Sequence, residues 1–109
     1  MKVEFCVEDA ARTYHMHMLT LPFDKHMLDK GVLACWHRDH LAERVDNPNI
    51  TGGVEIFPFE LKNIVKGFIL PKMPKYVNAN NHYARQYNKC RRMVDYWKSG
   101  DSIVMWIKH

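Results

Sequence analysis

The sequence lacks any long apolar run. No stretch approaches the roughly 18 consecutive apolar residues that a membrane-spanning helix needs. Charged residues appear from the start, at Lys2, Glu4 and Glu8, whereas a signal peptide needs a longer uncharged stretch. We therefore expect a cytoplasmic protein that does not contact a membrane.

Cysteine is scarce as well. Only Cys6, Cys35 and Cys90 occur, and no two of them form a C-x-x-C pair, which excludes a zinc ribbon and a thioredoxin-like redox site. Their odd number and wide spacing predict reduced, mostly buried thiols in a reducing compartment. We expect Cys90 to be buried and Cys6 to be more exposed, because Cys6 lies opposite the buried face of its strand.

Several catalytic and nucleotide-binding signatures are also missing. The sequence has no G-x-G-x-x-G, no G-x-x-x-x-G-K-[ST] and no G-x-S-x-G motif, so dinucleotide sites, P-loops and the hydrolase elbow lack support. H-E-x-x-H is absent too, and nothing joins a cysteine to a base. Because these signatures are missing, we expect a protein that is not an enzyme.

The length and the apolar content of the chain predict a single globular domain over residues 1–109. Hydrophobic residues make up 47% of the chain and aromatic residues 12%, enough to bury a core. The first half predicts a hairpin of strands 2–7 and 13–21, with unbroken alternation in both. Residues 13–21 could also continue a helix from Glu8, but the alternation and the stop at Pro22 favour the strand. A helix is expected over 25–45, or two short helices broken near Gly31, ending before Asn47-Pro48-Asn49.

The second half begins with a short strand at 54–57 that Pro58 ends. Residues 59–66 could form a helical turn, and 64–70 could equally be a strand, followed by a stiff exposed loop at 71–75. A helix ending at Lys98 is the clearest element, since its apolar residues recur every three or four positions. These residues are Tyr83, Tyr87, Cys90, Val94 and Trp97.

An apolar strand at 103–107 should lie in the middle of the sheet. The predicted fold class is therefore α+β, with a small sheet of about four strands packed by two main helices. The strands would include the N-terminal hairpin and the buried C-terminal strand.

Positive charge is concentrated in one segment. Residues 71–98 hold seven basic residues and Asp95 alone, a net +6, whereas the rest of the chain holds nine basic and eleven acidic residues, a net −2. Such a face suits phosphates or carboxylates, although a solvated helix face would have the same composition. The residues expected on it are Lys72, Lys75, Tyr76, Arg85, Lys89, Arg91, Arg92, Tyr96 and Lys98.

The leading hypothesis is a small non-enzymatic binding protein that uses this basic helix and needs no cofactor. Its partner would be a nucleic acid or an acidic protein surface, and it could inhibit or modulate a larger enzyme. Met73 could contact the partner, although folding back onto the core is the simpler expectation. A homodimer is a further alternative that Trp36 and Trp106 could anchor, but both are expected in the core.

The histidines give a rival hypothesis. His15 and His17 share one side of a strand, and His37 and His40 are three residues apart on a helix. Four imidazoles from two elements could bind one divalent transition metal such as zinc, in a hydrolase or nuclease. Neither spacing matches a specific metal-binding signature.

Overall fold

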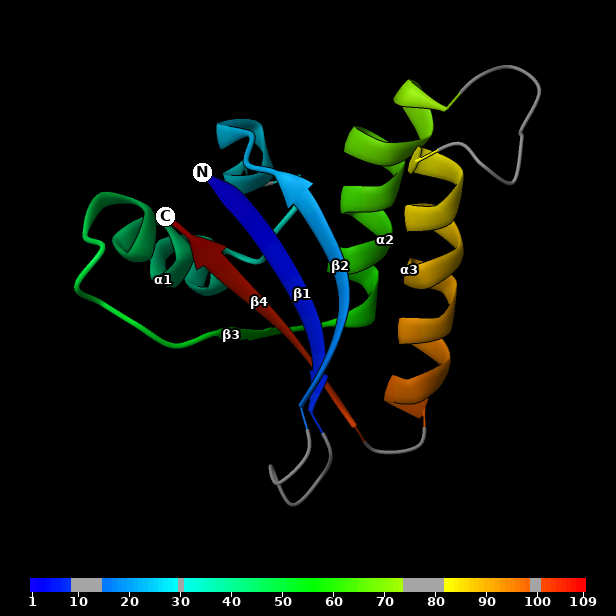
Figure 1. The fold of residues 1–109 in the computed structure, drawn as a ribbon. Coiled ribbons are helices and arrows are strands. Elements are labelled where there is room, and N and C mark those ends of the chain that lie inside the picture. Colours follow the sequence, from blue (N-terminus) through cyan, green and yellow to red (C-terminus); the bar gives the residue numbers. More distant parts are fainter. Residues whose placement is uncertain (9–14, 30, 74–81, 99–100) are drawn as a thin grey trace.

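The computed structural model describes residues 1–8, 15–29, 31–73, 82–98 and 101–109. A four-stranded antiparallel sheet packs against helices (Figure 1). The α+β fold class predicted from the sequence is confirmed.

The sheet has the strand order β2-β1-β4-β3. Its strands are β1 (Lys2–Glu8), β2 (His15–Pro22), β3 (Val54–Ile56) and β4 (Ser102–Lys108). β1 pairs with β2 as the predicted hairpin, and β4 lies between β1 and β3, in the interior position expected from its apolar sequence.

A β-bulge interrupts the hairpin. Phe5 pairs with Leu19, whereas the next residue, Cys6, pairs with His17, so β2 has one extra residue at this point. The expectation of unbroken alternation was therefore wrong.

The segment after the hairpin contains two short helices, as Gly31 suggested. The 3₁₀ helix η1 (Lys25–Leu28) begins after Asp24, whose Oδ1 accepts a hydrogen bond of 2.9 Å from the His26 backbone amide. The helix α1 (Cys35–Asp46) ends just before Asn47, at the predicted breaker.

A continuous helical segment follows β3, and it shows that the strand proposed for 64–70 was wrong. It consists of α2 (Pro58–Ile64), the π-helical turn η2 (Val65–Ile69) and the 3₁₀ turn η3 (Leu70–Lys72). Pro58 occupies the first position of α2, where its missing N–H costs no hydrogen bond. The loop predicted from residue 71 is therefore helical at its start.

The helix α3 (His82–Lys98) covers the sheet beside α2 and η2 (Figure 1). Cys90 is buried, and Tyr83, Tyr87 and Val94 pack against the core as the periodicity predicted. The side chain of Trp97 lies outside the described residues.

The core lies between one face of the sheet and the helices. Val3, Phe5 and Val7 of β1 face it, together with residues of all four strands and of α1, α2 and α3. Met73 is partly buried against this core, as the simpler expectation had it. No helix that the structure describes is long and apolar enough to cross a membrane.

Two burial expectations were wrong. Cys6 is fully buried, and Val104, with which it pairs on β4, is also buried, so the face of β1 opposite Val3, Phe5 and Val7 is covered at this position. Trp36 is 53% exposed, because α1 buries His37 and Leu41 and turns Trp36 to one side of them. Trp106 is half-buried.

Candidate partner-binding surface

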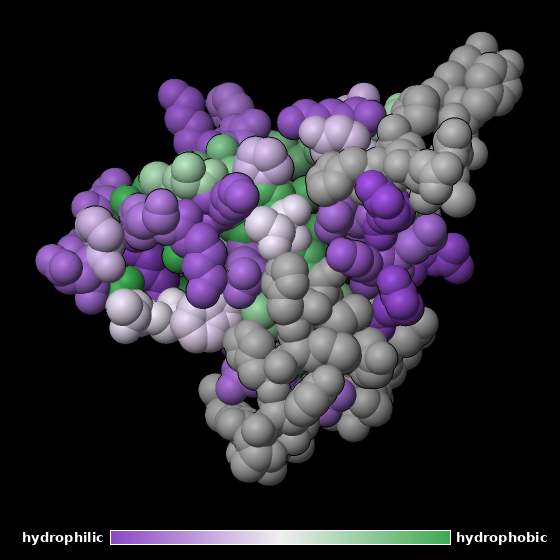
Figure 2. All heavy atoms as spheres, in the orientation of Figure 1, coloured by the Kyte–Doolittle hydropathy of each residue, from purple (hydrophilic) through white to green (hydrophobic). Residues whose placement is uncertain are grey.

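The outer side of α3 carries the predicted basic residues. The side chains of Arg85, Arg91 and Arg92 are exposed, and Lys89 is half-buried. Figure 2 shows hydrophilic residues along this side of the molecule. Four predicted members of this surface cannot be placed with the others. The structure does not describe the side chains of Tyr96 and Lys98, and Lys75 and Tyr76 lie wholly outside the described residues.

Lys72 extends this surface from the neighbouring segment. It is exposed at the end of η3, and its Nζ lies 5.8 Å from the centre of the Tyr83 ring at the start of α3. That distance allows a cation–π interaction. The contact places Lys72 beside the start of α3.

The cations of α3 are not neutralised within the described part of the chain. There, every cation within ion-pair distance of a carboxylate lies elsewhere in the fold: His26, His37, Arg38 and Lys108. Among the described residues, no carboxylate lies within ion-pair distance of the four basic side chains described on α3. We call Arg85, Lys89, Arg91 and Arg92 the α3 cationic face.

A groove runs between the segment α2–η2–η3 and α3. Its volume is about 530 Å³, within the range of sites that hold ligands. One wall comes from α2 to η3 and the other from α3. The described residues that line it are Leu61, Lys62, Val65, Lys66, Leu70, Tyr87, Cys90, Arg91 and Val94.

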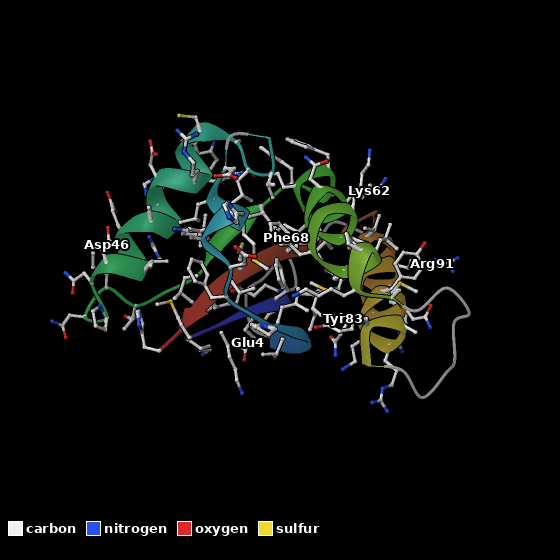
Figure 3. The ribbon with its side chains drawn as sticks, turned by 90° about the horizontal axis from the view of Figure 1, so that it is seen from above. Glu4, Asp46, Lys62, Phe68, Tyr83 and Arg91 are labelled. Carbon is white, nitrogen blue, oxygen red and sulfur yellow. The ribbon has the colours of Figure 1, made fainter. Side chains whose placement is uncertain are left out.

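Cations stand on both walls of this groove. Lys62 and Lys66 come from one wall and Arg91 from the other, and no described residue that lines the groove is acidic. Figure 3 shows Lys62 and Arg91 extending from neighbouring helices on the same outer side. The groove thus combines an apolar floor with a basic rim.

Cys90 contributes to the apolar floor. It is 3% exposed, and burial raises the pKa of its thiol to about 12. The side chain therefore stays neutral near pH 7 and behaves as a small apolar group.

His37 is bound to a buried carboxylate. Its Nδ1 lies 2.6 Å from Glu60 Oε1, and both side chains are almost fully buried. The same carboxylate accepts hydrogen bonds of 2.8 Å from the backbone amides of Ala34 and Phe57, which precede α1 and α2. The pair connects the starts of two helices, which is a structural role that the sequence analysis missed.

The other proposed metal ligands belong to separate elements of the fold. His40 is exposed, with its ring edge-on to Trp36, and α1 packs against β3 and β4. His15 and His17 belong to β2, at the opposite edge of the sheet, and their side chains lie outside the described residues. Within the described part, no three His, Cys, Asp or Glu side chains form a metal-binding group. The four-histidine site stays a prediction.

An exposed aromatic cluster lies above the His37–Glu60 pair. Trp36, Phe57 and Phe59 are 53%, 45% and 54% exposed. The rings of Phe57 and Phe59 stack with their centres 5.7 Å apart, and His37 lies 5.1 Å from Phe57. This cluster was not predicted from the sequence, because Trp36 was expected in the core.

The groove was missed for a different reason. Its Lys62, Lys66 and Leu70 lie in the segment whose secondary structure stayed ambiguous in the sequence. The spacing of Leu61 and Val65 beside these lysines is that of an amphipathic helix, and this signal could have found the basic wall.

Comparison with protein-family models, curated proteins and solved structures found no significant match to this chain.

Proposed function

We propose that this protein is a small non-enzymatic binding protein whose α3 cationic face contacts an anionic partner, and that the partner is an acidic protein surface. The observation that carries the proposal is the set of exposed arginines on α3, Arg85, Arg91 and Arg92, without a described carboxylate to pair with. Arginine binds carboxylates and phosphates with two parallel hydrogen bonds, so several on one helix favour an anionic partner.

The surroundings of α3 favour a protein over a nucleic acid. Single-stranded nucleic acids bind where aromatic rings are free to stack on the bases. The tyrosines described on α3, Tyr83 and Tyr87, instead pack partly against the core. Beside α3 lies an apolar groove, which suits apolar side chains of a protein better than a phosphate backbone.

A binding titration tests this proposal. The probes are an acidic helical peptide, a mixed-sequence RNA and a mixed-sequence DNA, each at about 50 and 200 mM salt. The variant Arg85→Ala/Arg92→Ala removes two charges from the α3 cationic face. The matched control, Lys2→Ala/Lys25→Ala, removes two charges from exposed positions elsewhere.

We expect the wild type to bind the acidic peptide, with weaker binding at the higher salt concentration. The α3 variant should bind about tenfold more weakly, because each lost charge contact is worth up to about 1 kcal/mol. The control should bind like the wild type. Equal losses of affinity in both variants would mean non-specific attraction by net charge. Tighter binding to RNA or DNA than to the peptide would mean that the partner is a nucleic acid and not a protein.

A further inference from the structure

We infer that the groove between α2–η2–η3 and α3 binds an amphipathic acidic helix of a partner protein. This inference rests on the proposed function, because it assigns a site and a form to the acidic partner. The described walls of the groove supply apolar contact along the centre and positive charge along both margins.

The spacing of the groove residues matches that of a helix laid along it. Tyr87, Cys90 and Val94 on α3 stand at positions i, i+3 and i+7, which span about 10 Å at 1.5 Å per residue. Peptide helices bound in grooves use anchors at the same spacing. A partner helix of about two turns could therefore match the described length of this wall.

On the opposite wall, apolar residues continue to face the groove through the π-helical turn η2. Leu61 and Val65 are four residues apart, and the next apolar residue that lines the groove, Leu70, follows after five. That step agrees with the hydrogen bond from the Leu70 amide to the Val65 carbonyl, which is the i to i+5 pattern of a π turn. Ile69 is fully buried in the core instead, so Leu70, 42% exposed, offers its side chain at the groove.

The positive charges on both walls of the groove favour an acidic ligand. Lys62 and Lys66 are one helical turn apart on one wall, and Arg91 stands on the other. An amphipathic helix with carboxylates on both sides of its apolar stripe would pair with both walls. A fatty acid has one carboxylate and would leave most of these cations unpaired, so its chemistry fits less well.

The test uses a fluorescent peptide of about 14 residues with leucines at i, i+3 and i+7 and with Asp or Glu at the remaining exposed positions. A scrambled peptide of identical composition reports binding that depends on charge alone, and decanoate reports a small amphiphile. The groove variants are Leu70→Asp and Lys62→Glu/Lys66→Glu. Their controls are Ile50→Asp and Lys2→Glu/Lys25→Glu, which alter exposed residues outside the groove.

Each groove variant should bind the amphipathic peptide at least about tenfold more weakly than the wild type, as loss of a central interface contact does. The controls should stay within about twofold of the wild type. Since Leu70, Lys62 and Lys66 are exposed, circular dichroism should show the same fold in all variants.

Four outcomes would overturn the inference. If the scrambled peptide binds equally well, or if only Arg85→Ala/Arg92→Ala weakens binding, the partner uses the α3 cationic face and the proposed function survives without the groove. Binding of decanoate but of no peptide would assign the groove to a small amphiphile. If no acidic peptide binds at all, both the inference and the proposed function fail.

Discussion

Glu60 shows how one buried side chain can organise two helices. Its two carboxylate oxygens accept from the amides of Ala34 and Phe57 and contact Nδ1 of His37. A buried carboxylate is tolerated only when such partners satisfy it. Glu60 is therefore a structural residue, although a buried His–Glu pair resembles the acid–base pairs of active sites.

Glu60→Gln should lower the free energy of unfolding by about 2–4 kcal/mol, because an amide cannot accept all the bonds that the carboxylate accepts. Chemical denaturation monitored by circular dichroism measures the change. Glu43→Gln is the matched control, since Glu43 is exposed on α1. A Glu60 variant as stable as this control would mean that the pair contributes little.

The three thiols should differ in reactivity. Cys35 is exposed, whereas Cys6 and Cys90 are buried, and burial raises the pKa of each of these two to about 12. The thiolate is the reactive form, so iodoacetamide near pH 8 should modify Cys35 in the native protein, and all three only after denaturation. Mass spectrometry of the peptides identifies the sites, and early modification of Cys90 would contradict the buried position.

The same pKa values predict a loss of stability at alkaline pH. The pKa of Cys90 is higher in the folded protein than the ordinary value of 9.0, so its contribution is fully present below pH 9.0. As the pH rises further, the unfolded chain loses this proton first, and the free energy of unfolding falls by about 1.4 kcal/mol per pH unit for one thiol. Cys90→Ala should make the fall above about pH 9 shallower by that amount. Denaturation curves at several pH values measure it, and parallel slopes for both proteins would contradict it.

At the scale of elements, two glycines should respond in opposite ways to alanine. A Cβ at Gly53 would collide with Val104 and lie 2.7 Å from Cε2 of Trp106, whereas one at Gly67 would meet nothing within 4 Å. Gly53→Ala should therefore destabilise the β3–β4 edge by about 1–3 kcal/mol. Gly67→Ala should stabilise the helical segment by about 0.5–1 kcal/mol, because glycine has the higher conformational entropy when unfolded. Thermal unfolding measures both, and shifts of the same sign would be inconsistent with these environments.

The elements with the strongest patterns were the ones predicted well. The stripe of α3 has the period of a helix, the β-branched and aromatic residues in the apolar run of β4 favour a strand, and the break before Pro48 follows from the proline ring. The segment 64–70 could not be assigned, because a short apolar run fits a buried strand or a buried helix equally well. In its helical form this segment packs against α3, and sequence patterns do not reveal such contacts.

At the scale of the whole molecule, protection from hydrogen exchange should follow the strand order. β1 and β4 are hydrogen-bonded to neighbours on both sides, whereas β3 is a three-residue edge strand. Amides of β1 and β4 should therefore exchange by global unfolding, and those of β3 by cheaper local opening. Hydrogen exchange with mass spectrometry distinguishes them, and equal protection of β3 and β4 would contradict this ranking.

The candidate surface was predicted only in part. The α3 cationic face follows from the charge of residues 71–98 and the helical period, because the apolar stripe fixes which side faces outward. The second wall of the groove and the contact of His37 with Glu60 join residues distant in sequence, so neither has a local signature.

The pairing at the centre of the sheet also has a kinetic consequence. β1 and β4 are neighbours, with Lys2 opposite Lys108, so this ladder forms only when segments about a hundred residues apart meet. Such non-local pairing makes folding slow compared with that of a helical bundle of the same size. A circular permutant that joins β4 directly to β1 would turn this ladder into a local hairpin, and it should refold faster without any change of contact in the native state.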